Sequence, residues 1–468
     1  MDARLFDLNI ERILEAWDNS HAVRELIANA LDEQVLSRSA EVSIKKDPAG
    51  VWSIRDYGRG LRYDHFTQNE NPEKLKAAGR VIGKFGIGLK DAVATLTRNG
   101  IAVEFQSKHA VITFEQCGKH GFADVVTLHA NVAPPRDPRF KGTEVKFGGL
   151  KDADLVTAKA FFLKFSGEET IEATRLGSIL KKTGPRGRIY VAGLLIAEEE
   201  NFAFSYNITS MTEAMRKSLN RERTNVGRTA YSDRVKAMLL ASASQTVAES
   251  LAAQLRALQS GVASDEVKWK DVAIHACKIL NKTGNCVFVT SYQLTENADA
   301  IDAARSDGKQ IVVVPDAIYD DIRGQGDLDG NPIRDLAVFQ TEWNDSFTFD
   351  WVEPEQLTAL ERETFAHAKT LCRFAGGLPK KVRSIKISQT MRRDFLSGVD
   401  AVGLWDPATG DVVIRRDQLK SVKTFAATLL HEVAHASSGA GDLSRDFEDA
   451  LTVLLGAVAT TALATAPA

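Results

Sequence analysis

Two groups of residues, one near each end of the chain, combine side-chain types that can do chemistry. The first includes Glu25, Asn29 and Asp32, whose spacing of four and three residues places them on one face of a helix. A carboxylate beside a phosphate can orient or deprotonate a water molecule, and an amide oxygen one turn later can hold a magnesium ion. Taken alone, however, this trio is more typical of a solvated helix face.

Asp56 is the next candidate, because it follows a strand-like segment, 51–55, and precedes two glycines, Gly58 and Gly60. A buried carboxylate at the end of a strand can accept a hydrogen bond from an exocyclic amine. Glycines at this place let the backbone approach a flat base closely. These residues therefore predict a place for a nucleobase.

A glycine cluster, Gly83, Gly86 and Gly88, comes directly before a helix-like stretch, 89–96. Flexible backbone at a helix N-terminus favours anion binding, which suits a phosphate group. The GxxGxG pattern is a weak signal by itself, since most glycine clusters are turns. Its value comes from its position in the order of the motifs.

In this order, the motifs resemble those of the GHKL ATPase superfamily, which includes ninety-kilodalton heat-shock chaperones, DNA gyrase B subunits, MutL proteins and sensor histidine kinases. The matching segments are 24–32, 56–60, 83–88 and the pair Gly142-Thr143, and the resemblance spans residues 8–147. It implies a Bergerat-type α/β sandwich that binds ATP.

The resemblance also implies a role for each motif. Glu25 would be the general base, Asn29 the ligand of Mg²⁺ and Asp56 the acceptor for the adenine amine, with Thr143 supporting the adenine contact. Residues 61–82 would form a short lid over ATP. The nucleotide-binding residues that the resemblance implies are Asn29, Asp32, Asp56, Gly58, Gly60, Gly83, Gly86, Gly88 and Thr143.

Glu25 also separates branches of this superfamily, since histidine kinases typically lack that glutamate. The sequence shows no obvious phosphoacceptor-histidine helix, so ATP hydrolysis is favoured over phosphotransfer. In related ATPases the second domain sends a basic residue to the nucleotide, and Arg221 or Arg223 is a candidate for this γ-phosphate sensor. A solvated charged turn is the alternative for that stretch.

The second group is His431-Glu432-Val-Ala-His435, which lies in an otherwise apolar helical pattern, 424–435. Histidines four residues apart on one helix face can chelate zinc, and the adjacent Glu432 can act as a general base. Two buried structural histidines are the alternative. The module resembles the zincin metallopeptidases over residues 355–456, which implies a zinc-dependent peptidase.

The zincin resemblance leaves the third zinc ligand open between two residues. We expect Glu448, in the manner of glutamate-ligand zincins, with Asp442 as the alternative. The metzincin pattern HExxHxxGxxH is absent, because the glycine stands at 439, one position late. The preceding segment, 410–415, resembles the edge strand along which such enzymes align an extended substrate.

Composition excludes several classes of protein. The 468 residues are 44% hydrophobic and 26% charged, which is normal for a globular protein with buried cores. The formal net charge of −3 gives no basic excess for a nucleic acid or an anionic membrane. Four scattered cysteines without a CxxC pair argue against a disulfide framework or a cysteine zinc site. We therefore expect a cytoplasmic location.

Neither end of the chain resembles a targeting segment. The start lacks a basic region followed by an apolar run, so no signal peptide is expected. The last 18 residues, 451–468, are uncharged and rich in Ala, Thr and Gly. We expect them to form a buried final helix rather than a membrane anchor.

The succession of helical and strand-like patterns predicts a multidomain protein of mixed α+β and α/β class. We predict a GHKL ATP-binding domain at 1–150, a transducer-like domain at 151–262, a small α/β linker domain at 263–350 and a zincin-like α+β domain at 351–468.

Within these domains, 8–37 is expected to be helical with a break at 18–20, and 231–258 to be one long helix. The C-terminal domain is expected to contain two strands. The strand-like segments of the first two domains are 40–45, 50–55, 101–106, 110–114, 122–130, 143–147, 188–197 and 202–208.

Together the motifs predict an ATP-hydrolysing protein whose nucleotide state regulates a C-terminal zinc-dependent peptidase, with ATP, Mg²⁺ and Zn²⁺ as cofactors. A protein or peptide would be the substrate, and the superfamily implies ATP-dependent homodimerisation. No nucleic-acid or membrane partner is expected. Two alternatives stay open: a chaperone-like or scaffold ATPase with a structural or inactive zinc site, and a MutL-like DNA-processing ATPase.

Overall fold

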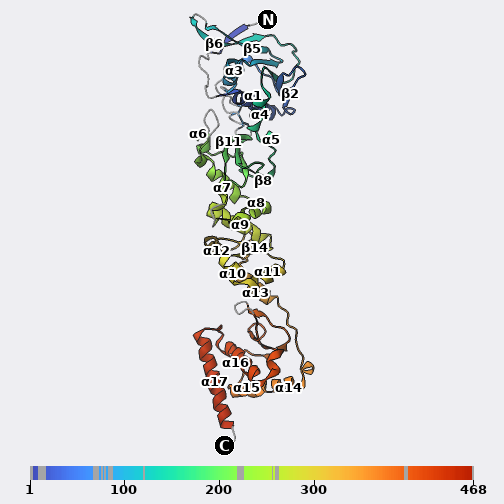
Figure 1. Cartoon of the computed structure of the whole chain (residues 1–468), viewed down its shortest axis with the longest axis vertical. Helices are drawn as coiled ribbons and strands as arrows, with labels where there is room; N and C mark the ends of the chain where they lie inside the picture. The colour runs from blue at the N-terminus through green and yellow to red at the C-terminus, as the bar shows by residue number, and fades with distance from the viewer. Residues whose placement is uncertain are drawn as a thin grey trace. The chain divides into compact units, whose positions relative to one another are not determined.

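The computed structural model describes residues 4–8, 17–66, 73–74, 77, 81–82, 88–119, 122–218, 226–255, 257–258, 263–394 and 399–465. The chain divides into two compact units, Met1–Thr283 and Gly284–Ala468. Each unit is described by itself, and Figure 1 labels their elements. The predicted class, a multidomain protein of mixed α+β and α/β type, is confirmed. The finer division into four domains stays a prediction.

The first part of unit 1 is a sandwich in which a layer of helices covers one sheet (Figure 1). Its seven strands have the order β1-β6-β5-β4-β7-β3-β2, and the neighbouring strands pair antiparallel. Apolar side chains from both layers form the core between them. The elements are β1 (Arg4–Asp7), α1 (Asn19–Ser37), β2 (Ser43–Lys46), β3 (Trp52–Arg55), η1 (Tyr63–Phe66), α3 (Gly88–Arg98), β4 (Ala102–Ser107), β5 (Val111–Lys119), β6 (Phe122–Ala133), β7 (Thr143–Gly148) and α4 (Asp152–Ala160).

Local sequence signals explain where α1 begins. Asp18 caps the helix, because its carboxylate accepts a hydrogen bond from the backbone N–H of His21 at 3.0 Å. The predicted break at 18–20 is therefore confirmed, whereas residues 9–16 of the predicted preceding helix lie outside the described residues. Strand β1 was not predicted, since four residues are too few to show a period.

The second part of unit 1 holds a five-stranded sheet of order β11-β10-β12-β9-β8. The predicted strand 188–197 is in fact two strands, because Ala192 and Gly193 form a turn with φ of 48° and 84°. The predicted helix 231–258 is two helices, which residues 241–244 separate. The elements are α5 (Leu163–Ser166), β8 (Thr170–Thr174), β9 (Gly177–Leu180), β10 (Gly187–Val191), β11 (Leu194–Glu199), β12 (Ser205–Ile208), α6 (Glu213–Ser218), α7 (Ser232–Leu240), α8 (Gln245–Leu255) and α9 (Lys270–Lys282).

Unit 2 begins with a parallel strand pair, β13 and β14, and continues with a three-stranded sheet of order β15-β19-β18. Five strands follow α15, where two were predicted. The elements are β13 (Cys286–Val289), α10 (Ser291–Glu296), α11 (Ala298–Ser306), β14 (Gln310–Val313), α12 (Asp316–Ile322), α13 (Leu336–Asp345), α14 (Ala359–Ala366), α15 (Ala368–Phe374), β15 (Ser384–Ser388), β16 (Arg393–Asp394), β17 (Val399–Asp400), β18 (Gly403–Asp406), β19 (Asp411–Arg415), α16 (Val422–Ser438) and α17 (Arg445–Thr465).

The prediction of a buried final helix is wrong. Helix α17 packs one face on α15 and α16, with Phe447 and Leu454 buried, while Val453 and Leu463 are exposed on the other. Among the described helices, α17 alone is long and apolar enough to span a membrane, and 11% of its most apolar window is buried. Length and composition by themselves do not place a helix in a membrane.

Candidate functional site

Helix α1 presents its polar residues to the interior and not to solvent. Asp32 is 1% exposed, and Glu25 and Asn29 are partly buried, while Leu26 and Ile27 on the neighbouring face belong to the core. A solvated helix face is therefore excluded for these residues. Burial of three polar side chains on one face requires polar partners, which identifies this face as a site.

Asp56 and Thr143 are brought together because β3 and β7 are neighbours in the sheet. The Asp56 carboxylate accepts hydrogen bonds from the backbone N–H groups of Gly58 at 2.9 Å and Thr143 at 3.2 Å. Burial raises the pKa of Asp56, and these hydrogen bonds oppose that rise. Gly142 permits the approach, since its φ is 79° and a Cβ would lie 1.9 Å from the Asp56 carbonyl oxygen.

One cavity of about 390 Å³ is lined by four of the nine predicted nucleotide-binding residues, Asn29, Asp56, Gly60 and Thr143. Asn29, Asp56 and Thr143 line it together, so the structure brings residues from three separate motifs to one place. This volume lies within the range of small-molecule sites. Its apolar lining residues are Leu26, Ala30, Ile54, Leu61, Leu89, Phe105 and Val145. The cavity thus offers apolar walls and one buried carboxylate, Asp56, as an adenine ring requires.

The predicted glycines have different places. Gly60 lines the cavity, whereas a Cβ at Gly58 would lie 2.4 Å from Oε1 of Glu33, so Gly58 allows Glu33 to approach the backbone. A Cβ at Gly88, the first residue of α3, would lie 2.6 Å from Oε2 of Glu25. Gly83 and Gly86 lie outside the described residues, as do the candidate sensors at positions 221 and 223.

Glu25 does not line the cavity itself, but it reaches the N-terminus of α3, where a phosphate is favoured. Its Oε1 accepts a hydrogen bond of 2.9 Å from Nη2 of Arg24. The Arg24 guanidinium is 1% exposed and lies 5.5 Å from the ring of Trp17 and 5.3 Å from the ring of Phe161. Glu25 is therefore held by a buried cation that aromatic rings fix in place.

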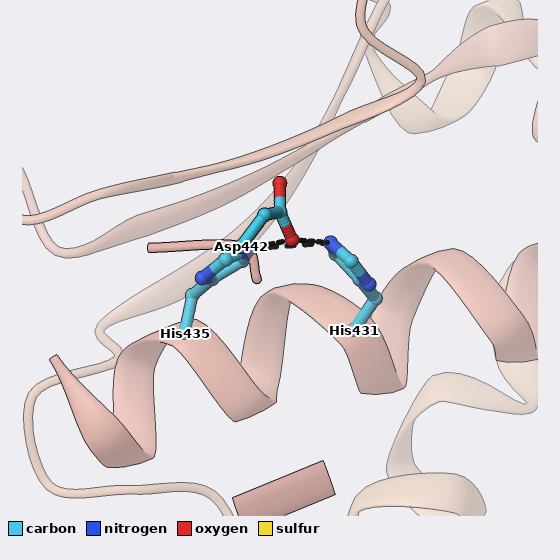
Figure 2. Close-up of side chains that lie close together, drawn as sticks. All are labelled: His431, His435 and Asp442. Atoms are coloured by element: carbon cyan, nitrogen blue, oxygen red, sulfur yellow. Dashed lines mark hydrogen bonds and ion pairs between the residues drawn. The ribbon is translucent and has the colours of Figure 1, made fainter. Parts of the chain in front are cut away.

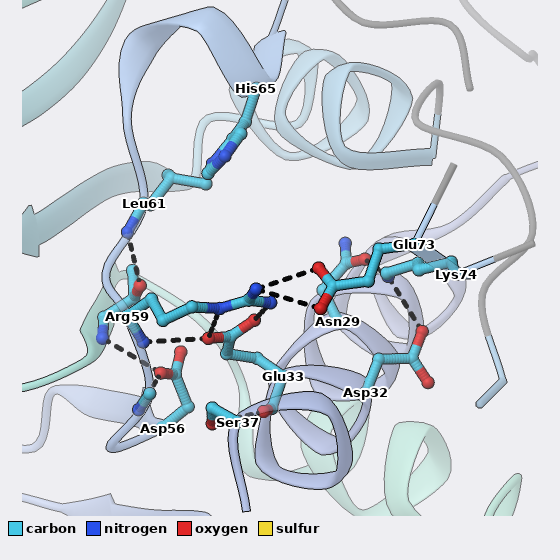
Figure 3. Close-up of polar contacts among 12 residues, drawn as sticks. Asn29, Asp32, Glu33, Ser37, Asp56, Arg59, Leu61, His65, Glu73 and Lys74 are labelled. Atoms are coloured by element: carbon cyan, nitrogen blue, oxygen red, sulfur yellow. Dashed lines mark hydrogen bonds and ion pairs between the residues drawn. The ribbon is translucent and has the colours of Figure 1, made fainter. Parts of the chain in front are cut away.

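Sequence reasoning missed three charged residues of this site, which Figure 3 shows with their contacts. Arg59 donates hydrogen bonds from Nε and Nη2 to the carboxylate of Glu33 at 2.9 and 2.8 Å, and from Nη1 to Glu73. Hydrogen bonds to Glu33 raise the pKa of Arg59. Burial alone would raise the pKa of Glu33, but Arg59 lowers it below its usual value. Glu33 stands one helical turn after Asn29, and this spacing could have indicated that both side chains lie on the same face of the helix.

Lys74 also was not singled out, and it makes the most direct contact with the predicted magnesium ligand (Figure 3). Its Nζ donates hydrogen bonds to Oδ1 of Asn29 at 2.9 Å and to Oδ2 of Asp32 at 2.8 Å. An ammonium group therefore stands where the side-chain oxygens of Asn29 and Asp32 converge.

In unit 2, α16 presents His431 and His435 to one point, together with Asp442 from the following loop (Figure 2). The two Nε2 atoms are 3.1 Å apart, and Oδ1 of Asp442 lies 3.2 Å from one and 3.3 Å from the other. Ligand atoms on a face of a tetrahedral zinc site are roughly 3.3 Å apart, given metal–ligand bonds of ~2.0–2.1 Å. The three atoms thus have the spacing of ligand atoms around one metal ion.

One hydrogen bond indicates the tautomer of His435. Its Nδ1 lies 2.8 Å from the carbonyl oxygen of Ala440, which can only accept, so Nδ1 carries a proton. In the neutral ring, Nε2 then directs a lone pair at Asp442. Two lone pairs at this distance repel unless a proton or a metal ion lies between them. Burial lowers the pKa of His431, which favours the neutral, metal-binding form of that ring.

Glu432 lies beside this cluster against the neighbouring strand β18. Burial raises the pKa of Glu432 to about 8, and a hydrogen bond from the backbone of Trp405 opposes the rise. A Cβ at Gly403 would lie 2.6 Å from Oε1 of Glu432, so glycine lets β18 approach the helix. A cavity of about 940 Å³ contains Glu432, both histidines and the whole stretch of β18 from Gly403 to Trp405.

The segment expected to be the edge strand is not at the edge. Strand β19, which contains residues 411–415 of that segment, is central, with β15 parallel on one side and β18 antiparallel on the other. Strands β15 and β18 are the edge strands, and among the described residues no strand pairs with the outer side of β18, which faces the metal-ligating residues' cavity. Strand order within a sheet is a tertiary property that this short segment does not encode.

Of the two candidates for the third ligand, the alternative Asp442 lies with the histidines, and the preferred Glu448 does not. The reason is the rotation of α17 about its axis. Phe447 faces the histidines, with its ring centroid 4.3 Å from that of His435 and 4.9 Å from that of His431. The next residue, Glu448, is therefore turned about 100° away and is exposed.

Comparisons with known proteins identify relatives of this chain, but none of these relatives has a described activity. A family model described as the Mycoplasma pneumoniae MPN635 N-terminal domain matches residues 153–245. An uncharacterized protein of Mycoplasma pneumoniae is 37% identical over 243 residues, which are 51% of this chain and 98% of that protein. A second uncharacterized protein of the same organism is 23% identical over 348 residues, which are 69% of this chain and 96% of that protein.

Among solved structures, the chain is similar to a topoisomerase IV ATP-binding domain of Francisella tularensis in complex with a small-molecule inhibitor. The TM-score is 0.18 and the identity 19%, and the match covers 35% of this chain and 50% of that chain. The chain thus spans about half of that structure, and a TM-score this low does not establish a common fold.

The identity of the third ligand generates a prediction. Asp442→Ala should weaken zinc affinity by about a hundredfold or more, because even changes outside the ligand shell cost ~10- to 100-fold. Glu448→Ala is the matched control and should leave the affinity unchanged. Competition with a chromophoric chelator measures both variants. Equal zinc affinity in Asp442→Ala and wild type would contradict the assignment.

Proposed function

The chain belongs to the same family as the uncharacterized Mycoplasma pneumoniae protein that it matches at 37% identity, and we propose that its N-terminal unit binds and hydrolyses ATP. The observation that carries this proposal is the shared cavity of Asn29, Asp56 and Thr143. The order of the four sequence motifs supports it, since the same motifs in the GHKL superfamily surround ATP.

In this proposal Asp56 accepts the hydrogen bond from the adenine amine, and the apolar walls of the cavity cover the ring. Asn29 and Asp32 would hold a magnesium ion, which would neutralise phosphate charge. Their oxygens fit such an ion, because they already bind the ammonium of Lys74 as a stand-in. Glu25, close to the N-terminus of α3, orients and deprotonates the attacking water.

Two variants separate binding from hydrolysis. Glu25→Ala should lower ATP turnover by about a hundredfold or more, which is the contribution of a general base, with nucleotide affinity retained. Asp56→Asn should weaken nucleotide affinity by about tenfold to a hundredfold, since a buried hydrogen bond to a charged group is lost. Phosphate release and calorimetric titration measure the two effects. Unchanged ATP turnover in Glu25→Ala would contradict the role of Glu25 as the general base.

For unit 2 we propose a zinc-dependent peptidase, because two imidazoles and a carboxylate converge beside a buried glutamate. His431, His435 and Asp442 would hold zinc, which when bound supplies a Lewis acid for the scissile carbonyl. Glu432 would take the proton of the attacking water in its ionised form, because the positive charge of a bound zinc ion would lower the pKa that burial raises. An extended peptide adds to the outer side of β18 by backbone hydrogen bonds, which places a peptide group opposite Glu432.

Glu432→Gln distinguishes this peptidase from a structural metal site. The variant keeps the shape of the side chain but cannot accept the proton, so peptide cleavage should fall by about a hundredfold or more. Bound zinc, measured by elemental analysis, should stay at the wild-type level. Cleavage of a fluorogenic peptide library gives the rate. A wild-type protein that binds zinc but cleaves no peptide would instead favour the chaperone-like or scaffold ATPase.

We propose further that the nucleotide state of unit 1 regulates cleavage in unit 2, as the presence of both sites on one chain suggests. ATP-dependent homodimerisation is part of this proposal, since GHKL relatives dimerise with ATP. The cytoplasmic location and the absence of nucleic-acid and membrane partners are likewise proposals. The MutL-like alternative is less favoured, because a net charge of −3 provides no basic stripe for DNA.

A further inference from the structure

We propose that the ammonium of Lys74 is a built-in competitor of the magnesium ion, so that the chain blocks its own nucleotide site until Mg²⁺–ATP displaces this side chain. The inference rests on the proposed ATP-binding function and deepens it by adding a form of self-inhibition. It starts from one contact: Lys74 binds the same side-chain oxygens that would hold the metal ion.

The distances show why the two cations exclude each other. The Lys74 nitrogen is 2.9 Å from Oδ1 of Asn29 and 2.8 Å from Oδ2 of Asp32, which are ammonium hydrogen-bond distances. A magnesium ion needs the same oxygens at ~2.0–2.1 Å in a nearly octahedral shell. Both cations cannot occupy one pair of oxygens, and their charges repel. Binding of Mg²⁺ therefore requires Lys74 to leave.

Burial makes this ammonium a strong competitor. Asp32 is 1% exposed, and the Lys74 side chain is 11% exposed, so water screens the pair weakly. A buried carboxylate that lost its cation would carry a large desolvation cost. Asp32 also accepts a hydrogen bond from the backbone N–H of Ile82, but a second cation that takes the place of Lys74 would avoid most of this cost. Whether Lys74 or Mg²⁺ occupies these oxygens would then depend on the magnesium concentration.

The neighbouring residue holds Lys74 in place. Glu73 accepts hydrogen bonds of 3.1 and 2.8 Å from Nη1 of Arg59, and Arg59 is bound in turn to Glu33 on α1. These three residues and Lys74 all line the cavity. These ion pairs thus link the backbone beside Lys74 to Arg59 and, through it, to α1. A nucleotide that enters the cavity with Mg²⁺ would therefore contact Lys74.

The test measures nucleotide affinity against magnesium concentration in the full-length chain, with a fluorescent ATP analogue and anisotropy. Lys74→Met should lower the Mg²⁺ concentration for half-maximal binding by about tenfold, the effect of losing one charge-assisted contact. Lys74→Arg keeps the charge and should resemble the wild type more closely. Lys151→Met removes an exposed charge away from the cavity and should leave the Mg²⁺ dependence unchanged.

Two further results keep the outcomes distinct. Glu73→Gln leaves Lys74 intact but weakens its anchor, and should shift the Mg²⁺ dependence in the same direction by a smaller factor, even where Lys74→Met folds poorly. Binding in Lys74→Met without binding in the wild type would support a complete block. An unchanged or higher Mg²⁺ requirement in both Lys74→Met and Glu73→Gln would overturn the competition between Lys74 and Mg²⁺ but not the proposed ATP binding. Absence of nucleotide binding in every variant at any Mg²⁺ concentration would overturn the proposed ATPase as well.

Discussion

Lone pairs that converge without a bridging positive charge repel one another, and both sites of this chain are organised around that constraint. In unit 2, two imidazole nitrogens and a carboxylate oxygen form a triangle with sides of 3.1 to 3.3 Å. In unit 1, the oxygens of Asn29 and Asp32 converge in the same way. A cation at the centre of either cluster would remove this repulsion.

The two units satisfy this constraint by different means. Unit 1 provides its own cation, the ammonium of Lys74, which arrives from a distant segment of the chain. In unit 2, the described residues place no lysine or arginine in ion-pair contact with the cluster, and its nearest aromatic neighbour, Phe447, excludes water from one side. Unit 1 is thus self-neutralised before it binds a metal ion, whereas unit 2 depends on a metal ion or a proton.

Chemistry that depends on local spacing could be predicted from the sequence, and chemistry that depends on packing could not. His431 and His435 share a helix face because they are four residues apart, and their convergence is confirmed. Asp56 and Thr143 meet only because β3 and β7 are adjacent, and family resemblance alone anticipated this. The place of Asp442 beside the histidines could not be predicted, because the packing of Phe447 sets the rotation of α17. The central place of β19 could not be predicted either, because strand order is a tertiary property.

The coupling of the two sites is tested most directly by one comparison, the rate of peptide cleavage by the zinc-loaded full-length chain with and without Mg²⁺–ATP. If nucleotide binding in unit 1 controls unit 2, the rate changes when Mg²⁺–ATP is added, and the nucleotide-binding variant Asp56→Asn removes that response. Equal cleavage rates in the two conditions would contradict regulation, and would leave two independent sites on one chain.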